Sequence, residues 1–228
     1  MHTKIMRTAV THDKNSPPLR HLCRCDEELS AVIYKLGDLS YFLYEDSFSF
    51  LIDTIIGQML SNKVADVISA RVCGLCEGNI LPEKLLALSI SELRKAGLSL
   101  AKTKYIHGIA QLYYDGPNFF TDLATKTDND VIKELKKLRG VGPWSAKMYL
   151  IFVLDRHDIL PFEDRAFQQT FCWMYPFVDS DKKSITEHCS KWSPYASIAS
   201  RYLYKALDSG LTKQPVQLLK NAYPKAHG

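Results

Sequence analysis

The sequence predicts an all-α protein built around a glycine hairpin that joins two helices. Three observations carry this prediction. Apolar residues recur at three- and four-residue steps along most of the chain, which is the period of an amphipathic helix. No segment alternates between polar and apolar residues for long enough to be a confident strand. Residues 138–150, LRGVGPWSAKMYL, place two glycines and a proline at the junction of two helical patterns.

The composition is that of a globular protein. Its 228 residues suffice to bury a full core, as one domain or as two tightly joined lobes. A hydrophobic content of 46% and a charged content of 24% argue against disorder. The net charge of +4 is compatible with a nucleic-acid partner without establishing one. No apolar run could span a bilayer and the first residues lack the apolar stretch of a secretory signal, so we expect no membrane association and a flexible tail over residues 1–20.

The cysteine pattern indicates neither zinc nor disulfides. Of the six cysteines, Cys73 and Cys76 form one CxxC pair, and no second pair follows at the spacing of a zinc site. A chain of this size inside a cell does not need disulfides for stability. We therefore expect reduced thiols and no metal bound by side chains.

Helical periodicity before the hairpin is continuous apart from short breaks. The segments with this period are residues 22–44, 47–61, 62–76, 81–88, 91–97 and 99–114. The second of them is nearly all apolar and should be buried between neighbours. Asp115-Gly116-Pro117 ends the last one, and residues 127–130 offer capping side chains for the first helix of the hairpin.

The hairpin itself reads Arg139-Gly140-Val141-Gly142-Pro143. Glycine takes positive φ at no steric cost, so the backbone can turn sharply, and Pro143 pre-sets the helical φ at the first position of the next helix. The turn and the helix N-terminus then project backbone amides at a spot bare of side chains, which suits a phosphate. An ordinary glycine turn inside a core is the alternative.

The residues after the hairpin favour the functional reading. Residues 156–167, RHDILPFEDRAF, form a short proline-containing loop that places carboxylates at the start of another helix. Together with the hairpin pattern L-x-G-V-G-x-x-x-A, this loop resembles the helix-hairpin-helix DNA glycosylase superfamily, most closely its 3-methyladenine DNA glycosylase II branch. The resemblance implies that Asp164 is the catalytic carboxylate, with the adjacent Glu163 as its main rival.

The resemblance also implies the domain organisation. Members of this superfamily have two helical lobes with a cleft between them. We expect a single glycosylase domain over residues 21–228, with one lobe made of residues 21–50 and 165–228. The other lobe, residues 51–164, would carry the hairpin.

Two further segments match the family. Residues 56–63, IGQMLSNK, resemble the stretch I-x-x-Q-Q-x-S, in which residues at a turn push into the DNA stack. Met59 is then a candidate wedge, with a place in the core as the alternative. Gln58 is expected to contact the base, with helix capping as the alternative, and Ser61 is expected to contact the DNA. Residues 97–106 resemble G-x-S-x-x-K-x-x-Y-I, so Lys102 is expected to reach a phosphate, and a solvated face is the alternative.

A third match lies near the C-terminus. Residues 192–204, WSPYASIASRYLY, resemble W-x-P-x-R-S-x-A-x-x-x-L-W. Ala196 stands where the family has arginine, and Tyr204 stands for the final tryptophan. The resemblance implies that Trp192 stacks on a flipped base.

The chemistry follows from the reaction that the resemblance implies. A base inside duplex DNA must be flipped into a pocket before its glycosidic bond is attacked, and Trp144, Met148 and Trp192 are expected to contact it there. Cleavage develops positive charge on the sugar, which a carboxylate beside C1′ stabilises while it orients the attacking water. Asp164 suits this role because the start of a helix favours an anion.

The mechanism is expected to be monofunctional. Bifunctional members carry a lysine two residues after the second hairpin glycine, where this chain has Trp144, and an indole cannot form a Schiff base. Lys147 lies on a different face of that helix and is a weaker substitute. An aromatic pocket suits electron-poor bases, so alkylated purines such as 3-methyladenine and 7-methylguanine are the expected substrates.

The expected partner is double-stranded DNA that contains damaged bases. Phosphate contacts should come from the hairpin backbone at Gly140, Val141 and Gly142 and from the side chains of Arg139 and Lys147, and should weaken with salt. We expect no cofactor except a monovalent cation on the hairpin carbonyls of Leu138 and Val141. A monomer is expected, in the cytoplasm or nucleoid of a prokaryote or the nucleus of a eukaryote. A bifunctional glycosylase/lyase and a non-catalytic DNA-binding module remain alternatives.

Overall fold

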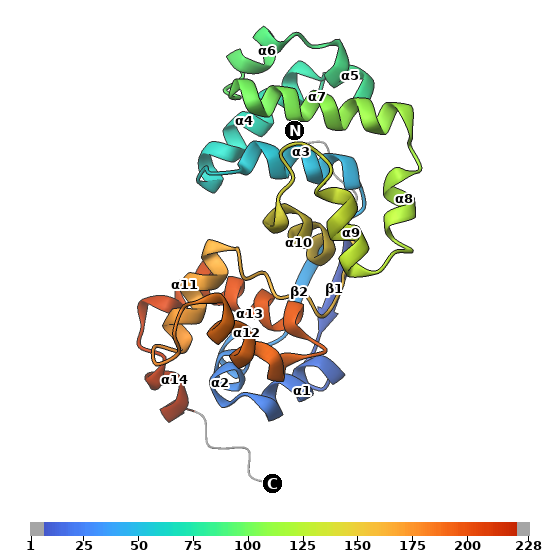
Figure 1. Cartoon of the computed structure of the whole chain (residues 1–228). Coiled ribbons are helices and arrows are strands. Elements are labelled where there is room, and N and C mark those ends of the chain that lie inside the picture. Colours follow the sequence, from blue (N-terminus) through green and yellow to red (C-terminus); the bar gives the residue numbers. More distant parts are fainter. Residues whose placement is uncertain (1–6, 223–228) are drawn as a thin grey trace. The chain divides into compact units, whose positions relative to one another are not determined.

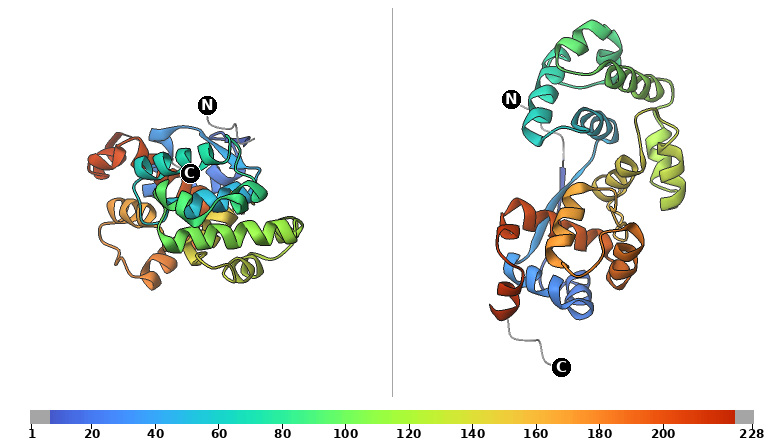
Figure 2. Two further views of the ribbon diagram at one scale, coloured as in Figure 1. Left: turned by 90° about the horizontal axis from the view of Figure 1, so that it is seen from above. Right: turned by 60° about the vertical axis from the view of Figure 1, so that its left-hand side comes forward.

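The computed structural model describes residues 7–222 and divides the chain into two compact units (Figures 1 and 2). Among the described residues, the first unit consists of residues 7–8 and 43–154, and the second of residues 9–42 and 155–222. The divisions fall after Thr8, Phe42 and Leu154, whereas the sequence predicts them near residues 20, 50 and 164. The cleft expected between two lobes stays a prediction.

The first unit is a set of helices around the apolar helix α3 (Ser47–Gly57). The others are α4 (Asn62–Leu75), α5 (Pro82–Ala87), α6 (Ile90–Lys95), α7 (Leu100–Asp115), α8 (Phe119–Leu123), α9 (Asp128–Leu135) and α10 (Pro143–Phe152). Helix α3 packs against α4, α7 and α10, which buries Phe48, Leu51 and Ile55. Its predicted burial is confirmed, and α7 in turn packs against α5 and α6 (Figures 1 and 2).

The second unit has its own hydrophobic core. Its helices are α1 (Pro17–Cys25), α2 (Glu27–Leu36), α11 (Arg165–Met174), α12 (Lys182–Cys189), α13 (Ala196–Asp208) and α14 (Gln217–Ala222), with short 3₁₀ turns at Ser190–Trp192 and Leu211–Lys213. Helix α13 packs against α11 and α2, and Phe167, Phe171, Trp192 and Tyr202 are fully buried in this core.

Two short strands were missed by the sequence analysis. Strands β1 (Arg7–His12) and β2 (Leu39–Tyr44) form a two-stranded sheet. Thr8 hydrogen-bonds to Glu45 and His12 to Tyr41, so the strands run antiparallel. The all-α class is confirmed, but the predicted flexible tail is wrong for residues 7–20, because this segment forms β1 and the start of α1. The rest of the predicted tail, residues 1–6, lies outside the described residues.

The predicted single helix over residues 22–44 is also wrong. Asp26 adopts an extended φ of −147° and caps α2, since its side chain accepts a hydrogen bond from the Leu29 amide. Gly37, with φ of +68°, ends α2 before β2 begins. Apolar residues continue at helical spacing across Asp26 and Gly37, so hydrophobic periodicity alone did not reveal these two helix ends.

Other general features of the described residues bear on function. None of the helices in residues 7–222 has the length and apolar character needed to cross a membrane. The same residues contain no group of three or more His, Cys, Asp or Glu side chains placed to hold a metal ion. The six cysteines are free thiols.

Candidate functional site

The hairpin connects α9 to α10 in the first unit, as predicted. Its tight turn is closed by the Val141 amide, which donates to the Leu138 carbonyl at 3.1 Å. Gly140 has φ of +89°, and a Cβ added there would lie 2.4 Å from Cδ2 of Tyr105. Gly142 has an ordinary extended backbone, with φ of −96° and ψ of −177°, at the N-cap of α10. Only Gly140 therefore requires glycine, both for its φ and for its space.

We expect Gly140→Ala to lower the free energy of unfolding by about 2 kcal/mol or more, because it combines a strained φ with a clash against the Tyr105 ring. Gly142→Ala is the matched control, and we expect it to cost less than about 1 kcal/mol. Urea unfolding of both variants measures the difference. Equal losses from the two substitutions would contradict this reading of the turn.

The hairpin residues that were expected to contact a phosphate differ in their solvent exposure. Arg139 is exposed and Lys147 is half-buried. Val141 is buried, and its amide donates to the Leu138 carbonyl; its contact with a phosphate stays a prediction. Phosphate binding at the start of α10 likewise stays a prediction, which rests on the preference of a helix N-terminus for an anion.

The carbonyl groups of the hairpin are partly engaged. The Leu138 oxygen accepts the Val141 amide and retains a second lone pair, so it fits a cation ligand. The monovalent cation at Leu138 and Val141 stays a prediction.

The turn between α3 and α4 exposes Met59. This residue has φ of +59° and is 96% exposed, which rules out the alternative that it belongs to the core. Ser61, at the N-cap of α4, is exposed as well. Both residues lie on one solvent-facing turn, and their roles against DNA stay predictions.

Gln58 and Lys102 make internal contacts where we expected contacts with DNA. The Gln58 amide nitrogen donates to the Gly140 carbonyl at 2.8 Å and to the Ser145 hydroxyl at 3.3 Å, so it is directed at the hairpin and not at a base. The Lys102 ammonium donates to the carbonyls of Ile56 at 2.8 Å and Gln58 at 2.7 Å. Its expected phosphate contact is therefore replaced by an internal one, at the negative end of α3.

Helix α10 carries two of the residues that were expected to contact a base, Trp144 and Met148. Trp144 is half-buried, so part of its indole is accessible. Met148 is only 6% exposed, which leaves it little surface for the predicted contact with a base.

In the second unit, Asp164 is the N-cap of α11. Its Oδ1 accepts the Phe167 amide at 2.8 Å, and its own amide donates to the Pro161 carbonyl at 2.9 Å. The side chain is half-buried, so it is held in place without being sealed from solvent. The predicted position at a helix start is confirmed, and it belongs to Asp164, while Glu163 precedes the cap.

Tyr204 on α13 lies near this carboxylate. Burial and the negative charge of Asp164 raise the pKa of the Tyr204 phenol well above its ordinary value. The phenol therefore stays protonated and can donate to the carboxylate. The sequence shows only that Tyr204 stands where the resembling family has tryptophan, and no signal in it points to Asp164 as a neighbour.

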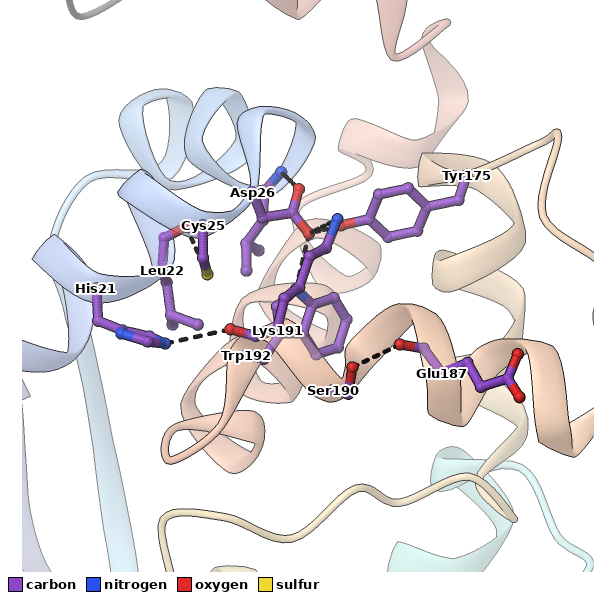
Figure 3. A network of polar contacts seen from close by, with 10 residues as sticks. His21, Leu22, Cys25, Asp26, Tyr175, Glu187, Ser190, Lys191 and Trp192 are labelled. Atoms are coloured by element: carbon purple, nitrogen blue, oxygen red, sulfur yellow. Dashed lines mark hydrogen bonds and ion pairs between the residues drawn. The ribbon is translucent and has the colours of Figure 1, made fainter. Parts of the chain in front are cut away.

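The predicted stacking of Trp192 on a flipped base is wrong. Trp192 is fully buried, its ring lies edge-on to those of Phe167 and Phe171, and its indole nitrogen donates to Asp26 Oδ2 at 2.7 Å (Figure 3). Because Trp192 is fully buried in the hydrophobic core, neither face of its indole is accessible to a base.

Asp26 is the centre of this buried network, which the sequence analysis missed. Its Oδ2 also accepts the Tyr175 hydroxyl at 2.5 Å and the Lys191 ammonium at 3.0 Å (Figure 3). Burial opposes the charge, but the hydrogen bonds from Leu29, Tyr175 and Trp192, together with Lys191, outweigh it and hold the pKa of Asp26 below its ordinary value. The network is structural, since its carboxylate is only 2% exposed.

The fold and these elements define a helix-hairpin-helix protein with a solvent-accessible aspartate capping a later helix. Residues 52–194 match the family model described as "HhH-GPD superfamily base excision DNA repair protein". The chain belongs to this superfamily.

Individual relatives agree with this assignment. The chain is similar to the crystal structure of a DNA-3-methyladenine glycosidase from Bacillus halodurans, with a TM-score of 0.80 and a sequence identity of 30%. The superposition covers 93% of this chain and 99% of that one. It is 26% identical to the "Alkylbase DNA glycosidase-like protein mag2" of Schizosaccharomyces pombe, covering 82% of this chain and 91% of that protein. It is 35% identical to the "DNA-3-methyladenine glycosylase" of Saccharomyces cerevisiae over 56% of this chain and 46% of that protein. The chain thus spans about half the length of some curated relatives that it matches, 45% and 46% in two cases.

Proposed function

We propose that the protein is a monofunctional DNA glycosylase that removes alkylated purines, such as 3-methyladenine and 7-methylguanine, from double-stranded DNA in base excision repair. The observation that carries the proposal is Asp164, a half-buried carboxylate held at a helix N-terminus after a proline loop. The names of the relatives, which refer to 3-methyladenine and alkylated bases, support the substrate class.

In the proposed reaction the damaged nucleotide leaves the stack, and its base meets the accessible part of Trp144. The bond between the base nitrogen and C1′ breaks with both electrons going to the base. An alkylated purine is already cationic, so it departs as a neutral molecule. Asp164 stabilises the positive sugar and accepts a proton from the water that adds to C1′, which leaves an abasic site and the free base.

The arrangement of the hairpin helix supports hydrolysis over lyase chemistry. Trp144 has no amine, and the one lysine of α10 is Lys147, three residues further along. We propose in addition that the protein acts as a monomer, in the cytoplasm or nucleoid of a prokaryote or in the nucleus of a eukaryote.

One experiment tests the reaction class. The full chain is incubated with duplex DNA treated with a methylating agent, and the released bases are separated by chromatography. A parallel sample is treated with borohydride, which traps any Schiff base to DNA. We expect release of methylated purines and no trapped adduct, because Trp144, at the position where a lyase needs a lysine, has no amine.

Two results would redirect the proposal. A trapped adduct that disappears in Lys147→Ala would make the protein a bifunctional glycosylase/lyase. Tight DNA binding with no base released from any methylated duplex would make it a non-catalytic module.

A further inference from the structure

The turn that follows α3 is both exposed and strained. Gln58 comes directly after the last helical residue, and Met59 has φ of +59°. A left-handed φ is unfavourable for a residue with a Cβ, so contacts elsewhere must hold this conformation. The Met59 side chain contributes little to them, since the residue is 96% exposed.

Lys102 supplies contacts that hold the turn. Its ammonium reaches the carbonyls of both Ile56 and Gln58, at 2.8 and 2.7 Å. Two other carbonyls at the helix end, those of Thr54 and Gly57, accept the amides of Gln58 and Leu60. The helix end therefore depends on Lys102 for two of its acceptors, and its negative dipole favours a cation there.

Helix α7 contacts both this turn and the hairpin, the first through Lys102 and the second through Tyr105. Lys102 lies in the first turn of α7, where its amide donates to the Ser99 hydroxyl at 3.2 Å. One helical turn later, the ring of Tyr105 lies against Gly140, so close that no Cβ would fit. The same face of α7 thus supports both the Met59 turn and the hairpin.

Gln58 completes the connection. Its backbone carbonyl accepts the Lys102 ammonium, while its side-chain amide donates to the Gly140 carbonyl at 2.8 Å. A single residue therefore joins the clamped helix end to the glycine of the hairpin. Displacement of the turn would pull on the hairpin backbone.

We propose that Lys102 is a positioning residue that holds the Met59 turn in register with the Gly140 hairpin, so that the side chain entering the DNA stack and the backbone binding the phosphates act as one rigid element. The proposal rests on the proposed function, and it assigns Lys102 no contact with DNA. Lys102 contributes to opening the stack and has no part in cleavage of the glycosidic bond.

The test compares two duplexes that carry the same methylated purine. In one, the lesion is paired with its normal partner; in the other, it lies opposite an abasic-site analogue, where the stack is already open. Lys102→Met removes the ammonium and keeps an aliphatic chain. We expect the ratio of single-turnover excision rates, paired to open, to fall about tenfold, because two charge-assisted hydrogen bonds are lost.

A double-mutant cycle separates positioning from simple loss of stability. Met59→Ala should lower the same ratio, and Lys102→Met should add little in the Met59→Ala background, because both act on one step. Lys104→Met is the matched control, since Lys104 is an exposed lysine on the same helix, and the ratio should not change. Should Lys102→Met slow both duplexes equally, or add fully to Met59→Ala, the proposal is overturned.

A second variant and a second measurement keep the test independent of folding and of catalysis. If Lys102→Met does not fold, Gln58→Glu replaces the donor toward Gly140 by an acceptor and should lower the same ratio; an unchanged ratio overturns the proposal. If the wild type releases no base, the proposed function fails, and 2-aminopurine paired with thymine in a closed duplex reports stack opening by fluorescence. We expect a smaller fluorescence rise with the Lys102 or Gln58 variant than with the wild type, and an equal rise contradicts the proposal.

Discussion

Replacing Asp164 with asparagine should slow base release by about a hundred- to a thousandfold, which is the size expected when one preorganised electrostatic group is removed. Asparagine is an equally good N-cap, and its side-chain oxygen can still accept the Phe167 amide. The charge is therefore removed while the helix start is kept. Single-turnover release of methylated purines from duplex DNA measures the effect, and urea unfolding should show nearly unchanged stability.

The neighbouring carboxylate provides the control for this substitution. Glu163→Gln changes one charge next to Asp164 but lies outside the cap, so we expect most of the activity to remain. An Asp164→Asn variant that keeps more than half of its rate would remove the basis of the proposed mechanism. Loss of activity in Glu163→Gln alone would transfer the catalytic role to Glu163.

Replacing Asp26 with alanine should lower the free energy of unfolding by about 3–5 kcal/mol, the usual cost of breaking a buried ion pair from one side. The substitution leaves the Tyr175 hydroxyl, the Trp192 indole and the Lys191 ammonium without their shared acceptor. It also removes the N-cap of α2. Urea unfolding at neutral pH measures the loss.

The pH dependence of this loss has a definite sign. The pKa of Asp26 in the folded protein is below its ordinary value of 3.8, so the folded state favours the ionised form. The stabilisation is complete above 3.8 and disappears as the pH falls through the folded pKa. The gap between wild type and Asp26→Ala should therefore be constant near neutrality and narrow only in strong acid.

A second capping aspartate serves as the comparison. Asp181 caps α12 through the amides of Lys183 and Ser184, but it is exposed. Asp181→Ala should cost clearly less than Asp26→Ala. Equal losses would mean that the buried network of Asp26 adds nothing beyond its helix cap.

Local signals correctly predicted the helices and the turn that carry the candidate site. The period of apolar residues identified α3 as a buried helix, and the pattern of glycines and proline located the hairpin between α9 and α10. A carboxylate three residues after a proline was correctly expected at a helix start, which Asp164 occupies. These features depend on backbone preferences and on neighbours within one helical turn, so a short stretch of contiguous residues is enough to predict them.

The failures concern side chains whose partners lie far away in the chain. Trp192 was assigned to a base, yet its indole bonds to Asp26, 166 positions away. Lys102 was assigned to a phosphate, yet it bonds to carbonyls 46 and 44 positions away. A tryptophan or a lysine suits both a ligand and an internal acceptor, and composition and spacing carry no information on which of them lies nearby.

The sequence by itself determined the helical class, the hairpin and the capping aspartate, because each follows from the backbone geometry that a few adjacent residues allow. Only the tertiary structure decided which polar side chains face solvent and which are used inside the protein. The reason is that burial and hydrogen bonding depend on elements packed together from distant parts of the chain, as for Asp26 with Tyr175 and Trp192, and for Lys102 with the end of α3.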